Sequence, residues 1–169
     1  SIRTRRPVSD DLAQFFPATI ELSLFTLTIA LIVGIPIGIT GATHSEKLRG
    51  YVVRVSSLVA NSIPLFWLGL MMMMIFYGGL RVAPLGRIGE TIPPPQHITG
   101  MYVIDSILSG NWPALLDSLH HLALPGVTLA LVVLPTVTRM LRGNLLEALD
   151  QDYVAVARAK GLKERDVLY

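Results

Sequence analysis

The sequence contains no cysteine, and this absence excludes disulfide bonds and thiolate metal sites. Charge is also scarce: Asp, Glu, Lys and Arg make up 15% of the 169 residues, whereas soluble domains carry about 25%. The net charge of +2 is too small to indicate a nucleic-acid partner. By contrast, 51% of the residues are hydrophobic and many of them form long runs. These features place the chain in the membrane class.

Motifs for catalysis and nucleotide binding are missing as well. There is no G-x-x-x-x-G-K-[ST], H-E-x-x-H or G-x-S-x-G, and the Gly-rich stretch at residues 38–43 lacks the lysine of a phosphate-binding loop. His120 and His121 are adjacent, so their side chains diverge by about 100° on a helix, and we interpret them as a pair at the lipid headgroup level. We therefore predict no enzyme activity and no catalytic, cofactor-binding or metal-binding residue on this chain.

Three apolar runs, at about residues 18–43, 52–77 and 122–141, predict membrane spans and an all-α, polytopic fold. In the first run, small residues such as Gly34 and Gly38 allow another helix to approach closely. Glu21 is the only ionisable residue of that run. We expect it in the first helical turn, where the helix dipole favours a carboxylate.

The middle of the second run is polar and contains a proline, in the order Asn61-Ser62-Ile63-Pro64. Backbone groups freed by a proline need partners inside the bilayer. Asn61, Ser62 and Pro64 are therefore candidates for lining a translocation pathway. Hydrogen bonding between helices, without contact to cargo, is an equal alternative.

Residues 79–120 are rich in proline and glycine and predict a long external loop. Within it, Tyr102–Leu108 and Trp112–Leu119 predict two short helices at the membrane interface, anchored by Tyr102 and Trp112. Residues 1–16 are polar and basic, and we expect them in water or among the headgroups.

The basic residues orient the predicted spans. They are frequent in the short turn after the first span and after the third span, whereas the long loop holds only Arg81 and Arg87. The positive-inside rule then places the short turn and residues 145–169 in the cytoplasm. Arg3, Arg5 and Arg6 oppose this orientation, and a span preceding them would account for it.

The stretch Asp152–Leu162 is Ala-rich and helix-favouring, and it follows the third predicted span. Small side chains permit close approach to a partner, Tyr153, Val154 and Leu162 offer apolar anchors, and Gly161 can adopt a positive φ that ends the helix. We interpret the stretch as a helix that docks on another protein outside the membrane. An amphipathic helix lying on lipid is the alternative.

Several of these motifs resemble one family. Pro17-Ala-Thr-Ile-Glu-Leu, Ser62-Ile-Pro-Leu-Phe-Trp-Leu-Gly-Leu, Val82-Ala-Pro-Leu-Gly and Gln151-Asp-Tyr-Val-Ala-Val-Ala-Arg-Ala-Lys-Gly-Leu are similar to permease subunits of binding-protein-dependent ABC importers. The stretch from Ile98 to Trp112 is similar to an external loop of the dipeptide/oligopeptide/nickel class, in its first permease. The resemblance implies the type I ABC importer transmembrane fold and about six spans in the whole subunit, of which this chain would be an internal fragment with about three.

The same resemblance implies a coupling helix with the signature E-A-A-x-x-x-G. Counting back from Gly161 places that signature at Ala155-Val156-Ala157, with Ala155 where the family has an acid. The implied contacts to an ATP-binding subunit are made by Tyr153, Ala155, Ala157, Arg158, Lys160, Gly161 and Leu162. A salt bridge from the acid of the signature is not expected here.

The resemblance implies an inner-membrane, multi-pass permease that forms the translocation pathway for peptides or related small solutes. The implied partners are ATP-binding subunits that hold ATP and Mg, a second permease, an external solute-binding protein and membrane lipid. A secondary transporter with broken helices at Pro36, Pro64 and Pro135 is one alternative, although it would need ionisable groups at mid-membrane. A membrane scaffold without a transport role is another.

Overall fold

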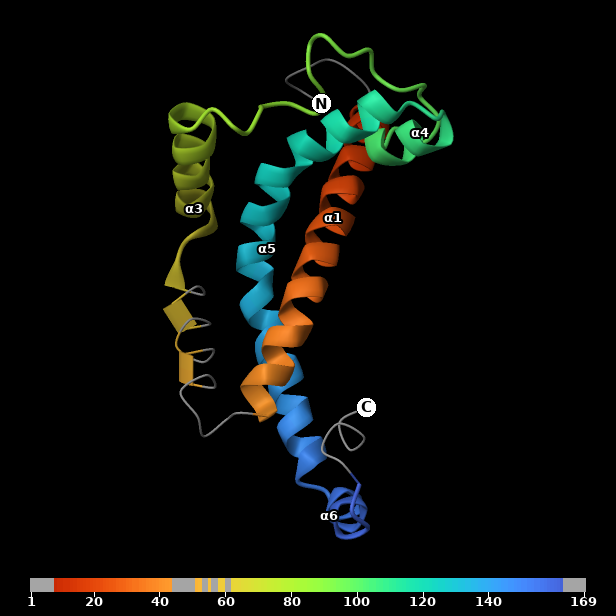
Figure 1. The fold of residues 1–169 in the computed structure, drawn as a ribbon. Helices are drawn as coiled ribbons and strands as arrows, with labels where there is room; N and C mark the ends of the chain where they lie inside the picture. The colour runs from red at the N-terminus through yellow and green to blue at the C-terminus, as the bar shows by residue number, and fades with distance from the viewer. Residues whose placement is uncertain (1–7, 44–50, 53–54, 56–57, 60–61, 163–169) are drawn as a thin grey trace. The chain divides into compact units, whose positions relative to one another are not determined.

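The computed structural model describes residues 8–43, 51, 52, 55, 58, 59 and 62–162, except the side chains of residues 155 and 158. The regular elements are α1 (Val8–Thr43), α3 (Leu65–Met72), the π-helix η1 (Met73–Gly79), α4 (Tyr102–Leu108), α5 (Trp112–Leu149) and α6 (Asp152–Ala159). No strand is present among the described residues, so the predicted all-α class is confirmed there. Figure 1 shows the order of these elements along the chain.

Two of these helices are long and apolar enough to cross a membrane: α1, with 36 residues, and α5, with 38 residues. A rise of about 1.5 Å per residue makes each longer than the bilayer core of about 30 Å. Only 22% of the most apolar window of α1 and 39% of that of α5 is buried within this chain. Large apolar side chains such as Leu24 and Ile32 are exposed, at 53% and 68%. Such faces suit lipid or other membrane helices rather than water.

The helix boundaries differ from the prediction in three places. α1 begins at Val8, so residues 8–16 are helical and Glu21 lies well inside the helix rather than in its first turn. Trp112–Leu119 is not a separate short helix, because it continues without a break into α5. The predicted helix at Tyr102–Leu108 is confirmed as α4.

The second apolar run is interrupted where the polar pair and the proline predicted a disturbance. The backbone is irregular at Ile63 and Pro64, and α3 starts directly afterwards, with Pro64 as its N-cap in an extended conformation. The Pro64 carbonyl accepts a hydrogen bond from Leu68 N–H at 3.0 Å. Proline suits this position because the N–H groups at the start of a helix have no partner within the helix. In the helix interior, the missing N–H of a proline would remove a hydrogen bond. α3 then continues into the wider turns of η1.

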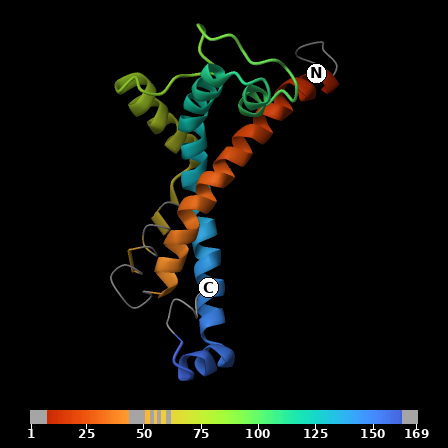
Figure 2. The same ribbon diagram turned by 45° about the vertical axis from the view of Figure 1, so that its right-hand side comes forward.

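The contacts divide the chain into two compact units, and α1 and α5 each contribute to both. The first unit comprises Ser1–Ile29 and Ile63–Val132. In it, α5 packs against α1 at Gly126, where an added Cβ would come within 2.7 Å of Phe25 Cε1. Figures 1 and 2 both show α4 beside the N-terminal part of α1.

The second unit comprises Ala30–Ser62 and Val133–Tyr169. Here two glycines of α1 face α5: a Cβ on Gly34 would lie 3.0 Å from Val137 Cγ1, and one on Gly38 would lie 3.0 Å from Leu141 Cδ2. The predicted role of these glycines in close helix approach is thus confirmed. The Arg142 side chain donates to the Gly41 carbonyl at 3.1 Å, which satisfies one of the last carbonyls of α1.

Candidate functional site

The stretch predicted to dock on a partner folds as a short helix with a glycine-terminated end. α6 covers Asp152–Ala159, and Gly161 adopts φ +81°. Leu162 N–H donates to the Ala157 carbonyl, and Lys160 N–H donates to that of Val156. The bond from Leu162 back to Ala157 is the long bond of a Schellman helix end, for which a left-handed residue at Gly161 is required. Figures 1 and 2 show α6 running across the end of α5 rather than along it.

The exposed side chains of α6 and its end include apolar ones. Tyr153, Val156 and Leu162 are 65%, 53% and 50% exposed, and Lys160 and Gly161 are exposed with them. Ala157 is half-buried. Val154 is only 4% exposed, so the prediction that it serves as an apolar anchor for a partner is wrong. Val156, which the sequence analysis did not single out, presents an apolar surface in its place.

The predicted coupling contacts at Ala155 and Arg158 involve side chains outside the described part of the structure. Of the predicted pathway residues, Asn61 lies outside it as well. Ser62 is exposed, and its hydroxyl donates to the carbonyl of Leu58, four positions earlier in the chain, at 3.1 Å. Ser62 and Pro64 therefore mark the interruption of the second run, and their contact with cargo stays a prediction.

A polar cluster that the sequence did not reveal joins α1 to the long loop in the first unit. Arg87 Nη2 lies 2.9 Å from Glu21 Oε2 and donates to the Gly100 carbonyl at 2.9 Å. Its guanidinium also lies 3.8 Å above the ring of Tyr102. The second oxygen of Glu21 accepts the Val103 N–H of α4. We call Glu21, Arg87, Gly100, Tyr102 and Val103 the loop clamp.

Both carboxylate oxygens of Glu21 have partners in the loop clamp, and this explains how a carboxylate can be buried in an apolar helix. Glu21 is 7% exposed, which would be costly for an unpaired charge. Its pairing with Arg87 and with a backbone N–H offsets that cost. The clamp fixes the loop against α1, and this is a positioning role rather than a chemical one.

Next to the clamp, Asp105 organises the turn before α4. Its carboxylate accepts hydrogen bonds from the backbone N–H groups of Ile98, Thr99 and Gly100 and from the Thr99 hydroxyl. Burial acts to raise the pKa of Asp105, but these hydrogen bonds outweigh it, and the pKa lies below its usual value. The ionised carboxylate thus holds the turn that carries Gly100 to Arg87.

The two adjacent histidines bind different carbonyls. His120 Nε2 lies 2.8 Å from the Val82 oxygen, and His121 Nδ1 lies 2.8 Å from the Asp117 oxygen. Because a carbonyl only accepts, each of these nitrogens carries the proton. Among the described residues no group of three His, Asp or Glu side chains converges as a metal site would require.

The described structure combines two helices that are long and apolar enough to cross a membrane with a short glycine-terminated helix. Residues 34–169 match the family described as binding-protein-dependent transport system inner membrane component. The chain therefore belongs to that family of inner-membrane proteins, and its fold is the type I ABC importer transmembrane domain.

Similar proteins carry dipeptide-transport names. The chain is 45% identical over 163 residues to the probable D,D-dipeptide transport system permease protein DdpB of Escherichia coli strain K12, a match that covers 96% of this chain and 48% of that protein. It is 35% identical to the dipeptide permease DppB of Alkalihalophilus pseudofirmus, over 100% of this chain and 51% of the relative. It is 36% identical to the di/tripeptide permease DppB of Pseudomonas aeruginosa, over 100% of this chain and 50% of that relative. The chain spans about half the length of these relatives.

Proposed function

We propose that this chain is part of a multi-pass permease subunit that forms the translocation pathway of an ATP-driven importer for peptides or related small solutes. The family match over residues 34–169 carries the proposal. The peptide cargo follows the names of the relatives, which are dipeptide and di/tripeptide permeases. The loop clamp commits Glu21 and Arg87 to fixing the loop, and in this proposal the groups that hydrolyse ATP lie on other subunits.

In this proposal, ATP and Mg bind to separate ATP-binding subunits on the cytoplasmic side. α6 docks on one of them through Tyr153, Ala157, Lys160, Gly161 and Leu162, together with Ala155 and Arg158. The exposed apolar side chains at Tyr153 and Leu162 support this contact, because such groups drive association when they leave water. A second permease completes the pathway, and a solute-binding protein delivers cargo from outside.

Uptake by the reconstituted transporter tests the proposal. The full-length subunit is placed in vesicles with its partner permease and ATP-binding subunits, and labelled dipeptide is supplied with the solute-binding protein on the opposite side from ATP. We expect dipeptide uptake only when ATP and the binding protein are both present. Uptake driven by a proton or sodium gradient without ATP would instead show a secondary transporter. Absence of uptake under every condition would leave a scaffold role.

A further inference from the structure

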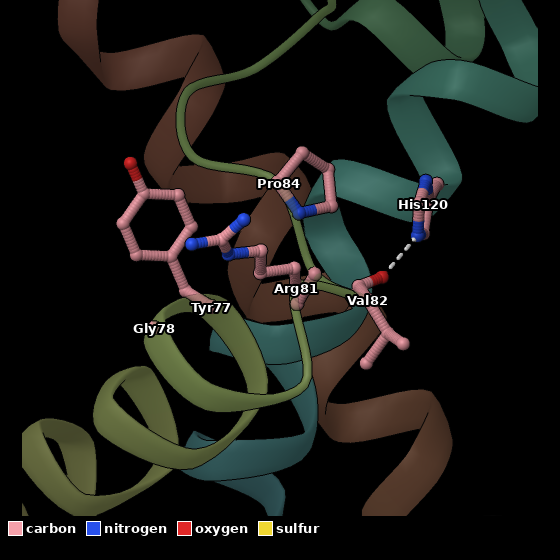
Figure 3. A pocket seen from close by; sticks show the side chains of 7 residues that line it. Tyr77, Gly78, Arg81, Val82, Pro84 and His120 are labelled. Atoms are coloured by element: carbon pink, nitrogen blue, oxygen red, sulfur yellow. Dashed lines mark hydrogen bonds between the residues drawn. The ribbon is translucent and has the colours of Figure 1, made fainter.

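A second polar region of the first unit lies at the end of η1, away from the loop clamp. A pocket of about 500 Å³ is lined there by Tyr77, Gly78, Arg81, Val82, Ala83, Pro84 and His120 (Figure 3). Its ionisable side chains are Tyr77, Arg81 and His120, and no carboxylate is among its lining residues. In the predicted orientation this pocket lies at the outer end of the second span.

The backbone at Arg81 is held in a conformation that side chains other than glycine rarely adopt. Arg81 has φ +55°, and it is the only non-glycine residue in the described part of the chain with a positive φ. Hydrogen bonds fix the residues on both sides: Leu80 N–H donates to Ile75 O at 2.8 Å and Val82 N–H donates to Phe76 O at 2.9 Å. Strain of this kind persists only where the surroundings impose it, and it concentrates at functional sites.

His120 adds a third restraint from α5. Its Nε2–H donates to the Val82 carbonyl at 2.8 Å, which ties the residue after Arg81 to the start of that helix. The π-helical turns of η1 lie directly before this segment, and π-helical turns are frequent at functional sites. His120 therefore acts as a positioning residue for Arg81.

The Arg81 side chain itself is uncommitted. It is exposed, and it makes no hydrogen bond or ion pair with another described side chain or carbonyl, whereas Arg87 is bound through Nη2 to Glu21 and Gly100. Figure 3 shows the Arg81 side chain extending toward Tyr77 and away from His120. The planar guanidinium of Arg81 carries only hydrogen-bond donors and can bind a carboxylate in a bidentate manner, and Tyr77 lines the same pocket with a hydroxyl that can donate.

We propose that Arg81 and Tyr77 bind the carboxylate of a peptide as it enters the pathway from outside. The proposal rests on the proposed function, because it assigns a site to the cargo of that importer. The cavity is in the size range of small-molecule sites and far exceeds one inorganic anion. A peptide with a free C-terminus supplies one carboxylate for Arg81, and the remaining volume holds the residue next to it.

Cysteine protection tests this site, and the sequence favours the method because it contains no cysteine. Ala83→Cys is introduced into the full-length subunit of an otherwise cysteine-free transporter, in phosphatidylcholine vesicles without solute-binding protein. The rate of labelling by a membrane-impermeant thiol reagent is measured with a dipeptide and with its C-terminal amide. We expect the dipeptide to slow labelling and the amide to do so far less. Arg81→Gln should raise the dipeptide concentration for half protection about ten-fold or more.

Two controls separate the site from general effects. Arg139→Gln removes the same charge at an exposed position on α5 outside the pocket and should leave protection unchanged. Gly78→Cys is a second reporter, because a Cβ added there meets nothing closer than Met73 O at 4.0 Å. As with Ala83→Cys, the dipeptide should slow labelling of Gly78→Cys more than its C-terminal amide does.

Equal protection by dipeptide and amide, or protection unchanged by Arg81→Gln, would overturn the carboxylate site. Slower labelling in vesicles that contain anionic phosphatidylglycerol, with no effect of dipeptide, would also overturn it and assign Arg81 to a lipid phosphate. ATP-driven uptake by the unmodified transporter is measured on the same vesicles. Its absence would contradict the proposed function, whereas intact uptake with unchanged protection in Arg81→Gln would contradict the carboxylate site alone.

Discussion

Asp105 shows how one buried carboxylate can order a loop. Its side chain is 1% exposed and accepts three backbone N–H groups and one hydroxyl, so the turn before α4 is built around a negative charge. Since Gly100 within that turn accepts a bond from Arg87, the charge on Asp105 also supports the loop clamp. Ionisation of this residue is therefore part of the native structure.

Asp105→Asn should loosen the loop. An asparagine has one acceptor oxygen and places an NH₂ donor against the remaining N–H groups, so we expect a loss of about 1.5–3 kcal/mol in local stability. Hydrogen exchange at Thr99 and Gly100 measures this loss, and Asp150→Asn, at an exposed position, is the matched control. Unchanged exchange in Asp105→Asn would refute the role of the carboxylate.

The pH dependence of the same exchange has a definite sign. The folded pKa of Asp105 is lowered, so its contribution is complete above the unfolded value of about 3.9 and is lost as pH falls through the folded value. The protection factor of the Thr99 amide, which is the intrinsic exchange rate at each pH divided by the observed rate, should therefore fall at acid pH in the wild type. In Asp105→Asn that fall should be smaller.

At the scale of the elements, the contact between α1 and α5 in the first unit depends on the absence of a side chain at Gly126. Gly126→Ala would drive a methyl group into the ring of Phe25, which is itself half-buried. Gly143, on the same helix, has no atom within 4 Å of an added Cβ. The two glycines form a natural pair for comparison.

We expect Gly126→Ala to cost about 1–3 kcal/mol through overpacking. Gly143→Ala should be neutral or stabilising by up to about 1 kcal/mol, because alanine favours helix over glycine. The midpoint of heat-induced loss of helical circular dichroism, measured on the full-length subunit in detergent, reports both. A drop in Gly143→Ala as large as in Gly126→Ala would contradict the packing argument.

The sequence predicted elements whose signals are local. Tyr102–Leu108 follows a glycine and a methionine and ends before Ser-Gly, and the helix has those limits. The sequence predicted a short interfacial helix at Trp112–Leu119 anchored by Trp112, yet the helix continues into the strongly apolar residues that follow, and the proline at position 113 is tolerated in its first turn. Local signals mark where a helix starts better than whether it merges with the next one.

At the scale of the whole molecule, the features that escaped prediction are those that join distant residues. Arg87 and Glu21 are 66 positions apart, and nothing in either neighbourhood marks them as partners. The buried state of Val154 and the positive φ of Arg81 likewise depend on tertiary contacts. The family, the helical class and the glycine-terminated end of α6 could be predicted because each is written in a contiguous stretch.

The proposed importer requires that movement of the ATP-binding subunits reach the membrane helices through α6. Gly161 offers a clean test, because its φ is +81° and an added Cβ would meet nothing within 4 Å. Within this chain a substitution there acts on the backbone conformation alone, and comparing two substitutions separates that effect from added bulk at the docking surface. Valine resists a left-handed conformation, whereas asparagine tolerates it.

The ratio of peptide taken up to ATP hydrolysed, in vesicles that contain the full transporter, is the most direct measurement. We predict that Gly161→Val lowers this ratio by roughly five-fold or more, as a cost of about 1–2 kcal/mol at the helix end would do. Gly161→Asn should retain most of it. A ratio in Gly161→Val equal to that of the wild type would contradict coupling through α6.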